Sequence, residues 1–100
     1  MKVKYSKSFM KAVQKLSGKM RQSVTDVIQE VVDAEGIEGI TDCKKLVGYK
    51  FMYRIRIGSY RAFFVFHVHI ENDVVEFEYL LKRGEAYDKK NEEKFREKDV

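Results

Sequence analysis

The stretch KKLVGYKFMYRIRIGSYRAFFVF, from Lys44 to Phe66, decides the fold. Apolar and basic residues alternate from Phe51 to Ile57, which is the period of a β-strand with two different faces. Gly58-Ser59 follows, and such a pair is typical of a two-residue hairpin turn with positive φ at the glycine. The residues from Tyr60 to Ile70 are rich in aromatic and β-branched types, which favour a returning strand. The stretch therefore predicts a β-hairpin.

The segments on either side of this hairpin complete an α+β pattern. A short strand is expected over Met1 to Tyr5, and Ser6 is a plausible N-cap for a first amphipathic helix. A second amphipathic helix is expected from about Lys19 to Ala34, and a third strand of the meander from Val74 to Lys82. The order β-α-α-β-β-β predicts an antiparallel sheet of about four strands with an N-terminal helical hairpin on one face.

Two expectations concern the C-terminal part of the chain. In the strand from Val74 to Lys82, strict alternation places the apolar residues on one face and Glu76 and Glu78 on the other. The residues from Asp88 to Val100 are highly charged, with Phe95 their only large apolar side chain. We therefore expect one domain over residues 1–87, followed by a charged C-terminal helix or frayed tail over residues 88–100.

Composition narrows the class of protein. The chain has 100 residues and 44% hydrophobic residues, which fits one domain with a packed core. One cysteine, Cys43, cannot form an internal disulfide, and one cysteine with two histidines makes a structural zinc site improbable. The N-terminus has no apolar signal region, and the longest apolar stretch is too short for a bilayer-spanning helix. A cytoplasmic protein without a cofactor is the expectation.

Charge is distributed unevenly along the chain. The net charge is +4, and the segment from Cys43 to Ile70 contains basic residues but no acidic one. Its basic residues are Lys44, Lys45, Lys50, Arg54, Arg56 and Arg61. A basic block of this kind is the electrostatic pattern of a phosphate-binding surface, although basic residues also occur on solvated strands.

Arginines concentrate on one face of the expected hairpin. Arg54 and Arg56 are two residues apart on one strand, and a two-residue turn at Gly58-Ser59 pairs Arg56 with Arg61. Like charges opposite each other destabilise a sheet, whereas guanidinium groups grip phosphates bidentately. The cluster therefore indicates a phosphodiester ligand.

Two structural explanations stand beside this interpretation. Glu76 and Glu78 could lie on the same face one strand further over, and we expect them to form ion pairs with the arginines. Alternatively, the arginines could be solvated, with their stems covering Phe63 and Val65.

The hairpin and its surroundings resemble the central signature of the RelE/ParE superfamily of bacterial and archaeal toxins. That signature joins a K-L-x-G segment, a Y-[KR]-[ILV]-[KR] strand and a G-x-Y-R segment that leads into an aromatic strand. Here KLVG (45–48), YRIR (53–56) and GSYR (58–61) supply the three parts in order. KRGEAY (82–87) supplies the closing motif, a basic pair followed by a tyrosine. The resemblance spans about Lys2 to Tyr87.

The resemblance to the RelE branch implies the toxin of a type II toxin–antitoxin system, which binds in the ribosomal A site and cuts mRNA. It implies that Arg61 and Arg83 contact the phosphate and the transition state, and that Tyr87 stacks on a base or transfers a proton. The full set of implied catalytic residues is Arg54, Arg56, Arg61, Arg83 and Tyr87. Basic residues that would anchor the protein to ribosomal RNA are Lys44, Lys45 and Lys50. Implied partners are an antitoxin, the ribosome and mRNA, with no membrane.

The identity of a general base stays open, because arginine has a pKa above 12 and serves poorly in that role. Candidates are His67, His69, Glu76, Glu78 and Tyr87. Both histidines share the strand face of Arg61 but lie six and eight residues beyond it, so we expect them to be packed strand residues. No carboxylates or histidines stand at metal-ligand spacing, so we expect a metal-independent endoribonuclease.

Two alternatives share the same fold. One is a ParE-like inhibitor of DNA gyrase, which acts by binding and needs no cluster of catalytic cations. The other is an inactive member that only binds its antitoxin. The arginines and Tyr87 together favour the ribonuclease.

Overall fold

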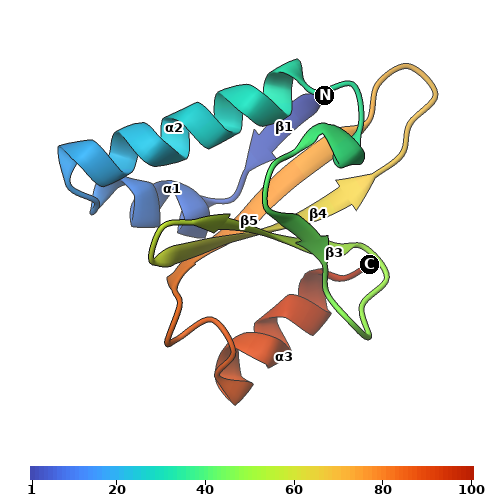
Figure 1. The fold of residues 1–100 in the computed structure, drawn as a ribbon. Coiled ribbons are helices and arrows are strands. Elements are labelled where there is room, and N and C mark those ends of the chain that lie inside the picture. Colours follow the sequence, from blue (N-terminus) through green and yellow to red (C-terminus); the bar gives the residue numbers. More distant parts are fainter.

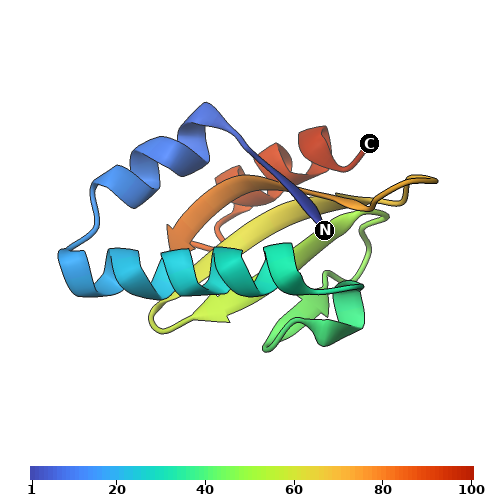
Figure 2. The ribbon, with the colours of Figure 1, turned by 90° about the horizontal axis from the view of Figure 1, so that it is seen from above.

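The computed structural model describes all 100 residues and contains three α-helices and a five-stranded sheet. Two helices cover one face of the sheet and the third helix lies against the other face (Figures 1 and 2). The elements are β1 (Lys2–Tyr5), α1 (Lys7–Gln14), α2 (Gly18–Asp33), a one-turn 3-10 helix (Ile37–Gly39), β2 (Cys43–Lys45), β3 (Met52–Ile57), β4 (Tyr60–His67), β5 (Val74–Lys82) and α3 (Lys89–Lys98). None of these helices combines the length and apolar character needed to cross a membrane.

Serine side chains start both helices of the hairpin. The Ser6 hydroxyl accepts a hydrogen bond from the Phe9 amide at 3.0 Å, and Ser17 caps α2 in the same way. The apolar stripes of α1 and α2 bury Phe9, Val24 and Val31 against the sheet, where they form the main core. The expected helical hairpin on one face of an α+β fold is therefore confirmed.

The sheet has the order β1-β5-β4-β3-β2, with β1 parallel to β5 and all other neighbours antiparallel. It has one strand more than the sequence predicted, because β2 is only three residues long and shows no alternating pattern. Its pairing places Lys44 opposite Arg54. The returning strand β4 ends at His67 rather than Ile70, and the three residues after it join an exposed loop.

The β3–β4 hairpin has the register that its turn predicts. Gly58 has a φ of 59°, which favours glycine, and Ile57 pairs with Tyr60 across the turn. Arg56 stands directly opposite Arg61. The hairpin thus fixes the positions of the arginines on the face that α3 partly covers.

A register shift between Phe63 and Phe64 corrects the predicted faces of β5. Phe64 pairs with Phe77 and Phe63 with Tyr79, so one extra residue, Glu78, lies between them on β5. Beyond this bulge the alternation is reversed. Tyr79 and Leu81 therefore pack on the α3 face rather than with Phe77, and the strict alternation predicted from sequence was wrong.

Helix α3 closes the second face of the sheet. Phe95 is 1% exposed and stacks on Phe63 with ring centroids 4.3 Å apart. The carboxylate of Asp99, just after the helix, accepts hydrogen bonds from the amides of Lys50 and Phe51 at 2.8 and 2.6 Å. Of the two expectations for residues 88–100, helix or frayed tail, the structure has a docked helix.

Candidate functional site

The predicted arginine cluster forms where the β-hairpin meets the open part of the α3 face. Arg54 and Arg56 project from β3, and Arg61 projects from β4 directly opposite Arg56. Arg61 is only 5% exposed, and its guanidinium donates to the carbonyl oxygens of Gly58 and Tyr60, both at 2.9 Å. The backbone of the turn therefore holds this guanidinium in a fixed orientation.

Positive charge in the cluster is not neutralised. Burial lowers the pKa of Arg61 below its usual value, and the charges of Arg56, Arg54 and Arg83 lower it further. The one ion pair of the protein within 4.0 Å joins Lys98 to Glu78, so none of the four arginines is paired with a carboxylate. An anion placed among them would relieve this repulsion.

The connection from β5 to α3 adds Arg83 and Tyr87 to the cluster. Arg83 is exposed, and its amide donates to the carbonyl of Ser59 at 2.8 Å, which ties the connection to the hairpin turn. Ala86 is fully buried beneath it. Tyr87 packs its ring edge against Phe63 with a centroid distance of 6.3 Å, yet remains 53% exposed. Tyr87 also lies close enough to Arg61 to act on the pKa of that guanidinium, which it raises. The five residues proposed for catalysis are therefore neighbours.

A groove of about 340 Å³ opens beside the cluster, between α3 and the β2–β3 segment. Arg54 and Tyr87 line it together with Lys44 and Lys45. The Nε atom of Arg54 is buried and has no hydrogen-bond partner. A buried donor without an acceptor costs about 1–3 kcal/mol, and the rest of the Arg54 side chain lines the groove, where its positive charge favours an anion.

Lys50 does not share this groove with the other two predicted anchors. It lies in the loop between β2 and β3, and its amide is bound to the Asp99 carboxylate at the far end of α3. The structure thus brings Lys44 and Lys45 to the arginines but leaves Lys50 apart.

The predicted ion pairs of Glu76 and Glu78 with the arginines were wrong. Glu78 pairs with Lys98 at 4.0 Å, and burial raises the pKa of its carboxyl above the usual value. Both glutamates line a hollow at the other end of the sheet, near the C-terminus of α3. The arginines also do not merely cover Phe63 and Val65, because Phe95 and Met52 share the cluster that buries these two side chains.

Neither histidine approaches the arginines. The ring of His67 packs on Phe51 with centroids 5.3 Å apart, at the end of β4 away from Arg61. His69 lies in the following loop, where its amide donates to the Asp73 carboxylate at 3.4 Å. No three side chains among histidine, cysteine, aspartate and glutamate converge in a way that could hold a metal ion. Of the five candidate bases, only Tyr87 lies at the cluster.

Sequence reasoning missed the residues that α3 contributes to the site. Glu92 and Phe95 form one wall of the groove, and Tyr49 lies opposite with the Arg96 guanidinium 4.5 Å from its ring centroid. Phe95 was the available signal, because one aromatic residue in a charged segment marks a buried position on an otherwise solvated helix. Its partner Phe63 could not be identified without the sheet.

Comparisons with known proteins agree with this fold. No family model matches the chain. The toxin RelE3 of Methanocaldococcus jannaschii is 32% identical over 89 residues, which cover 88% of this chain and 97% of that protein. The crystal structure of a RelB–RelE antitoxin–toxin complex from Methanococcus jannaschii matches with a TM-score of 0.66 at 27% identity, covering 84% of this chain and 94% of that one.

A further structure shows the fold alone. A free-state structure of an arginine double mutant of the E. coli toxin RelE has a TM-score of 0.70 at 22% identity. It covers 99% of this chain and 97% of that chain, so the common fold extends over nearly all of both. Given the identity to RelE3 over most of both sequences, the chain belongs to the RelE toxin superfamily.

Proposed function

We propose that this chain is a type II toxin that cleaves mRNA in the ribosomal A site. One observation carries the proposal: four arginines converge beside an exposed tyrosine, and no carboxylate neutralises them. A gyrase inhibitor of the same fold would need no such convergence. A cluster held at the expense of mutual repulsion is best explained by an anionic ligand.

The reaction is an internal phosphoryl transfer within RNA. The ribose 2′-oxygen attacks the adjacent phosphorus while the bond to the 5′-oxygen breaks, leaving a 2′,3′-cyclic phosphate and a 5′-hydroxyl. The 2′-hydroxyl loses its proton, and the departing 5′-oxygen gains one. Extra negative charge develops on the phosphate oxygens, and fixed positive groups stabilise it most where water is largely excluded.

Each residue has a role that follows from its position. Arg61 is oriented by two backbone carbonyls, so its remaining N–H groups are preorganised for the phosphate. Arg54, whose side chain lines the groove, would contact the phosphate from β3, and exposed Arg83 would contact it from the connection between β5 and α3. Tyr87 would stack on a base or transfer a proton, as the only one of the five candidate bases near the cluster.

Dependence on the ribosome follows from what the groove lacks. It is an open groove lined by both cationic and apolar side chains, which gives little control over the angle of attack. A ribosome-held codon would supply the alignment that this surface does not. Lys44 and Lys45, both exposed at the rim, would contact phosphates of ribosomal RNA, so binding would weaken steeply with salt.

We further propose an antitoxin partner that covers the basic face or displaces α3. The helix is held by the buried ring of Phe95, by Arg96 over the ring of Tyr49, by an Asn91 hydrogen bond, by one ion pair at 4.0 Å and by the Asp99 carboxylate. Such a small set of contacts is within the reach of a segment that folds on binding. Displacing α3 would also remove one wall of the groove.

The test is a cell-free translation reaction with purified protein, programmed ribosomes and primer extension of the mRNA. Cuts at A-site positions, with none on naked mRNA, are the expected result. Uncut mRNA with normal translation would overturn the ribonuclease proposal, and a DNA supercoiling assay would then test the gyrase alternative.

A further inference from the structure

One edge of β5 has no strand partner along its C-terminal half. Parallel pairing with β1 runs only from Val74 to Phe77, whereas β5 continues to Lys82. The Arg83 amide donates to the Ser59 carbonyl, so these two residues form a hydrogen-bonded pair of the antiparallel ladder. Because hydrogen-bonded pairs alternate with non-bonded ones, Arg61–Leu81 and Phe63–Tyr79 are hydrogen-bonded pairs as well. The backbone N–H and C=O of Leu80 and the N–H of Lys82 then point away from β4, where no strand pairs with them.

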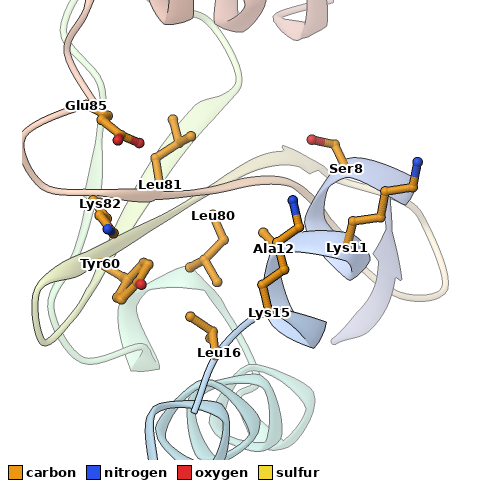
Figure 3. A pocket seen from close by; sticks show the side chains of 10 residues that line it. All are labelled: Ser8, Lys11, Ala12, Lys15, Leu16, Tyr60, Leu80, Leu81, Lys82 and Glu85. Atoms are coloured by element: carbon orange, nitrogen blue, oxygen red, sulfur yellow. The ribbon is translucent and has the colours of Figure 1, made fainter.

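This free edge opens into the largest groove of the protein, about 560 Å³ in volume (Figure 3). Ala12 of α1 and Lys15, the residue just after this helix, lie on one side of the groove, and Lys82 and Glu85 lie on the other, as Figure 3 shows. Leu16 contributes apolar surface to the groove. The groove is separate from the arginine site, because none of its lining residues is shared with the groove beside Arg54.

The rim of this groove is cationic. Lys11, Lys15 and Lys82 line it, and Glu85 is the one acidic residue among its lining side chains. Lys11 lies in the last turn of α1 and Lys15 is the C-cap of this helix, so two positive charges stand close together at the rim. The first 25 residues of the chain contain seven basic residues and no acidic one, so Glu85 is the one side chain of the lining that offsets the positive charge of the rim. An acidic partner would offset the rest.

We propose that this groove binds an extended acidic segment of the antitoxin, which adds to the sheet as a strand beside β5. Backbone groups of the segment would bond to Leu80 and Lys82, as in other peptides that extend a sheet edge. Its acidic side chains would pair with the lysine rim, and its apolar side chains would cover Leu16. The identity of the partner rests on the proposed toxin–antitoxin pairing, whereas the chemistry of the groove does not.

A peptide fits these features better than RNA does. Half of the ten lining residues are hydrophobic, and the unpaired backbone groups run along a strand direction. RNA would satisfy the lysines but would leave that apolar surface and those backbone groups without matching partners. Lysines on a free edge can also serve only to prevent self-association, and that role predicts no binding at all.

The test uses the full-length protein labelled with ¹⁵N and three probes. The first is an acetylated octapeptide of alternating glutamate and leucine, the second carries lysine in place of each glutamate, and the third is a uridine octamer. We expect the acidic peptide to shift the amide resonances of Leu80 and Lys82 and to slow their hydrogen exchange. The lysine peptide should leave both resonances unchanged.

Paired charge reversals separate this groove from general electrostatics. Lys11→Glu with Lys15→Glu should weaken binding of the acidic peptide about tenfold or more, because attraction at the rim becomes repulsion. Lys7→Glu with Lys19→Glu makes the same change in net charge at exposed positions outside the groove and should change the affinity less than twofold.

Several outcomes would overturn the proposal. Shifts of Leu80 and Lys82 by the uridine octamer rather than the peptide would make the groove an RNA contact. Resonance shifts confined to the region of Arg61 and Tyr87 would place the peptide in the arginine site. If no probe shifts any resonance, the lysines would serve only to prevent self-association of the sheet edge. Because the readout is binding to the free protein, it does not depend on whether the protein cleaves mRNA.

Discussion

Replacing Arg61 with alanine tests the proposed chemistry most directly. Arg61 is the most buried of the clustered arginines, and its guanidinium is held by the carbonyls of Gly58 and Tyr60. The substitution removes a preorganised cation from the phosphate site. It also leaves two backbone carbonyls without their donors and relieves repulsion from Arg54, Arg56 and Arg83.

These effects differ enough in size to be separated. Loss of one charge-stabilising donor typically lowers a rate by about 10²–10³-fold, or roughly 2.7–4 kcal/mol of transition-state stabilisation. Two lost hydrogen bonds from a charged donor cost at most about 3–6 kcal/mol, and relief of repulsion offsets part of that loss. We expect Arg61→Ala to lower mRNA cleavage at least about 100-fold while lowering the free energy of unfolding by only about 1–3 kcal/mol.

The assay is single-turnover cleavage on programmed ribosomes, with urea unfolding of each variant measured in parallel. Arg21→Ala is a matched control, because Arg21 also donates to two backbone carbonyls, those of Gln14 and Leu16, but lies on the helical hairpin. The control should cleave at the rate of the unchanged protein. A folded Arg61→Ala protein that cleaves within threefold of that rate would refute the catalytic assignment.

Four other predictions follow from single features. Phe95→Ala should lower the free energy of unfolding by about 3–5 kcal/mol, because Phe95 fills the space between α3 and Phe63. The control Lys94→Ala changes an exposed residue of the same helix and should leave the free energy of unfolding unchanged. Chemical denaturation measures both variants, and equal stability of the two would contradict docking of α3. Burial raises the pKa of Cys43 to about 11, so native protein should react with a thiol reagent at pH 8 about 100-fold more slowly than unfolded protein, and equal rates would count against this burial. For Asp99, burial alone would raise the pKa, but hydrogen bonds from the amides of Lys50 and Phe51 outweigh it and lower the pKa. Its stabilising effect is thus present above the ordinary aspartate pKa and is lost as pH falls through the lower native value, so unfolding measured from pH 6 down to pH 2 should show an acid loss that Asp99→Asn reduces. Cleavage should need no metal of the toxin's own, so a chelator that leaves the ribosomes intact should not stop it, and loss of cleavage under those conditions would contradict a metal-independent reaction.

Local patterns were sufficient to predict the hairpin but not the second face of the sheet. Alternation and the Gly58-Ser59 turn predicted the register of β3 and β4, because a two-residue turn leaves one way to pair the strands. The bulge at Glu78 was not predictable, because one extra residue reverses the faces of β5 without changing its composition. Parallel pairing of β1 with β5 depends on contacts far apart in sequence and was equally invisible.

The candidate site was likewise predicted only in part from local patterns. Proximity of Arg54, Arg56 and Arg61 followed from strand geometry, whereas proximity of Arg83 and Tyr87 came from the family signature alone. The expected partners of the glutamates were wrong because that expectation assumed an undistorted β5 and ignored Lys98 on α3. Side chains that a distant helix brings to a site leave no trace in the periodicity of the strands.

Helix α3 links stability to the candidate site. Burial of one phenylalanine contributes about 1.5–3 kcal/mol, and the Lys98–Glu78 contact adds little to it, because the two charges are 4.0 Å apart and Lys98 is half exposed. The Asp99 carboxylate adds two hydrogen bonds that also fix the loop carrying Tyr49 and Lys50. Since the same helix supplies Glu92 and Phe95 to the groove, release of α3 would expose Phe63 and open the groove together. A partner that offers its own apolar side chain to Phe63 could therefore replace the helix at little net cost. Under the proposed function, loss of this groove wall would lower cleavage even with every arginine still in place.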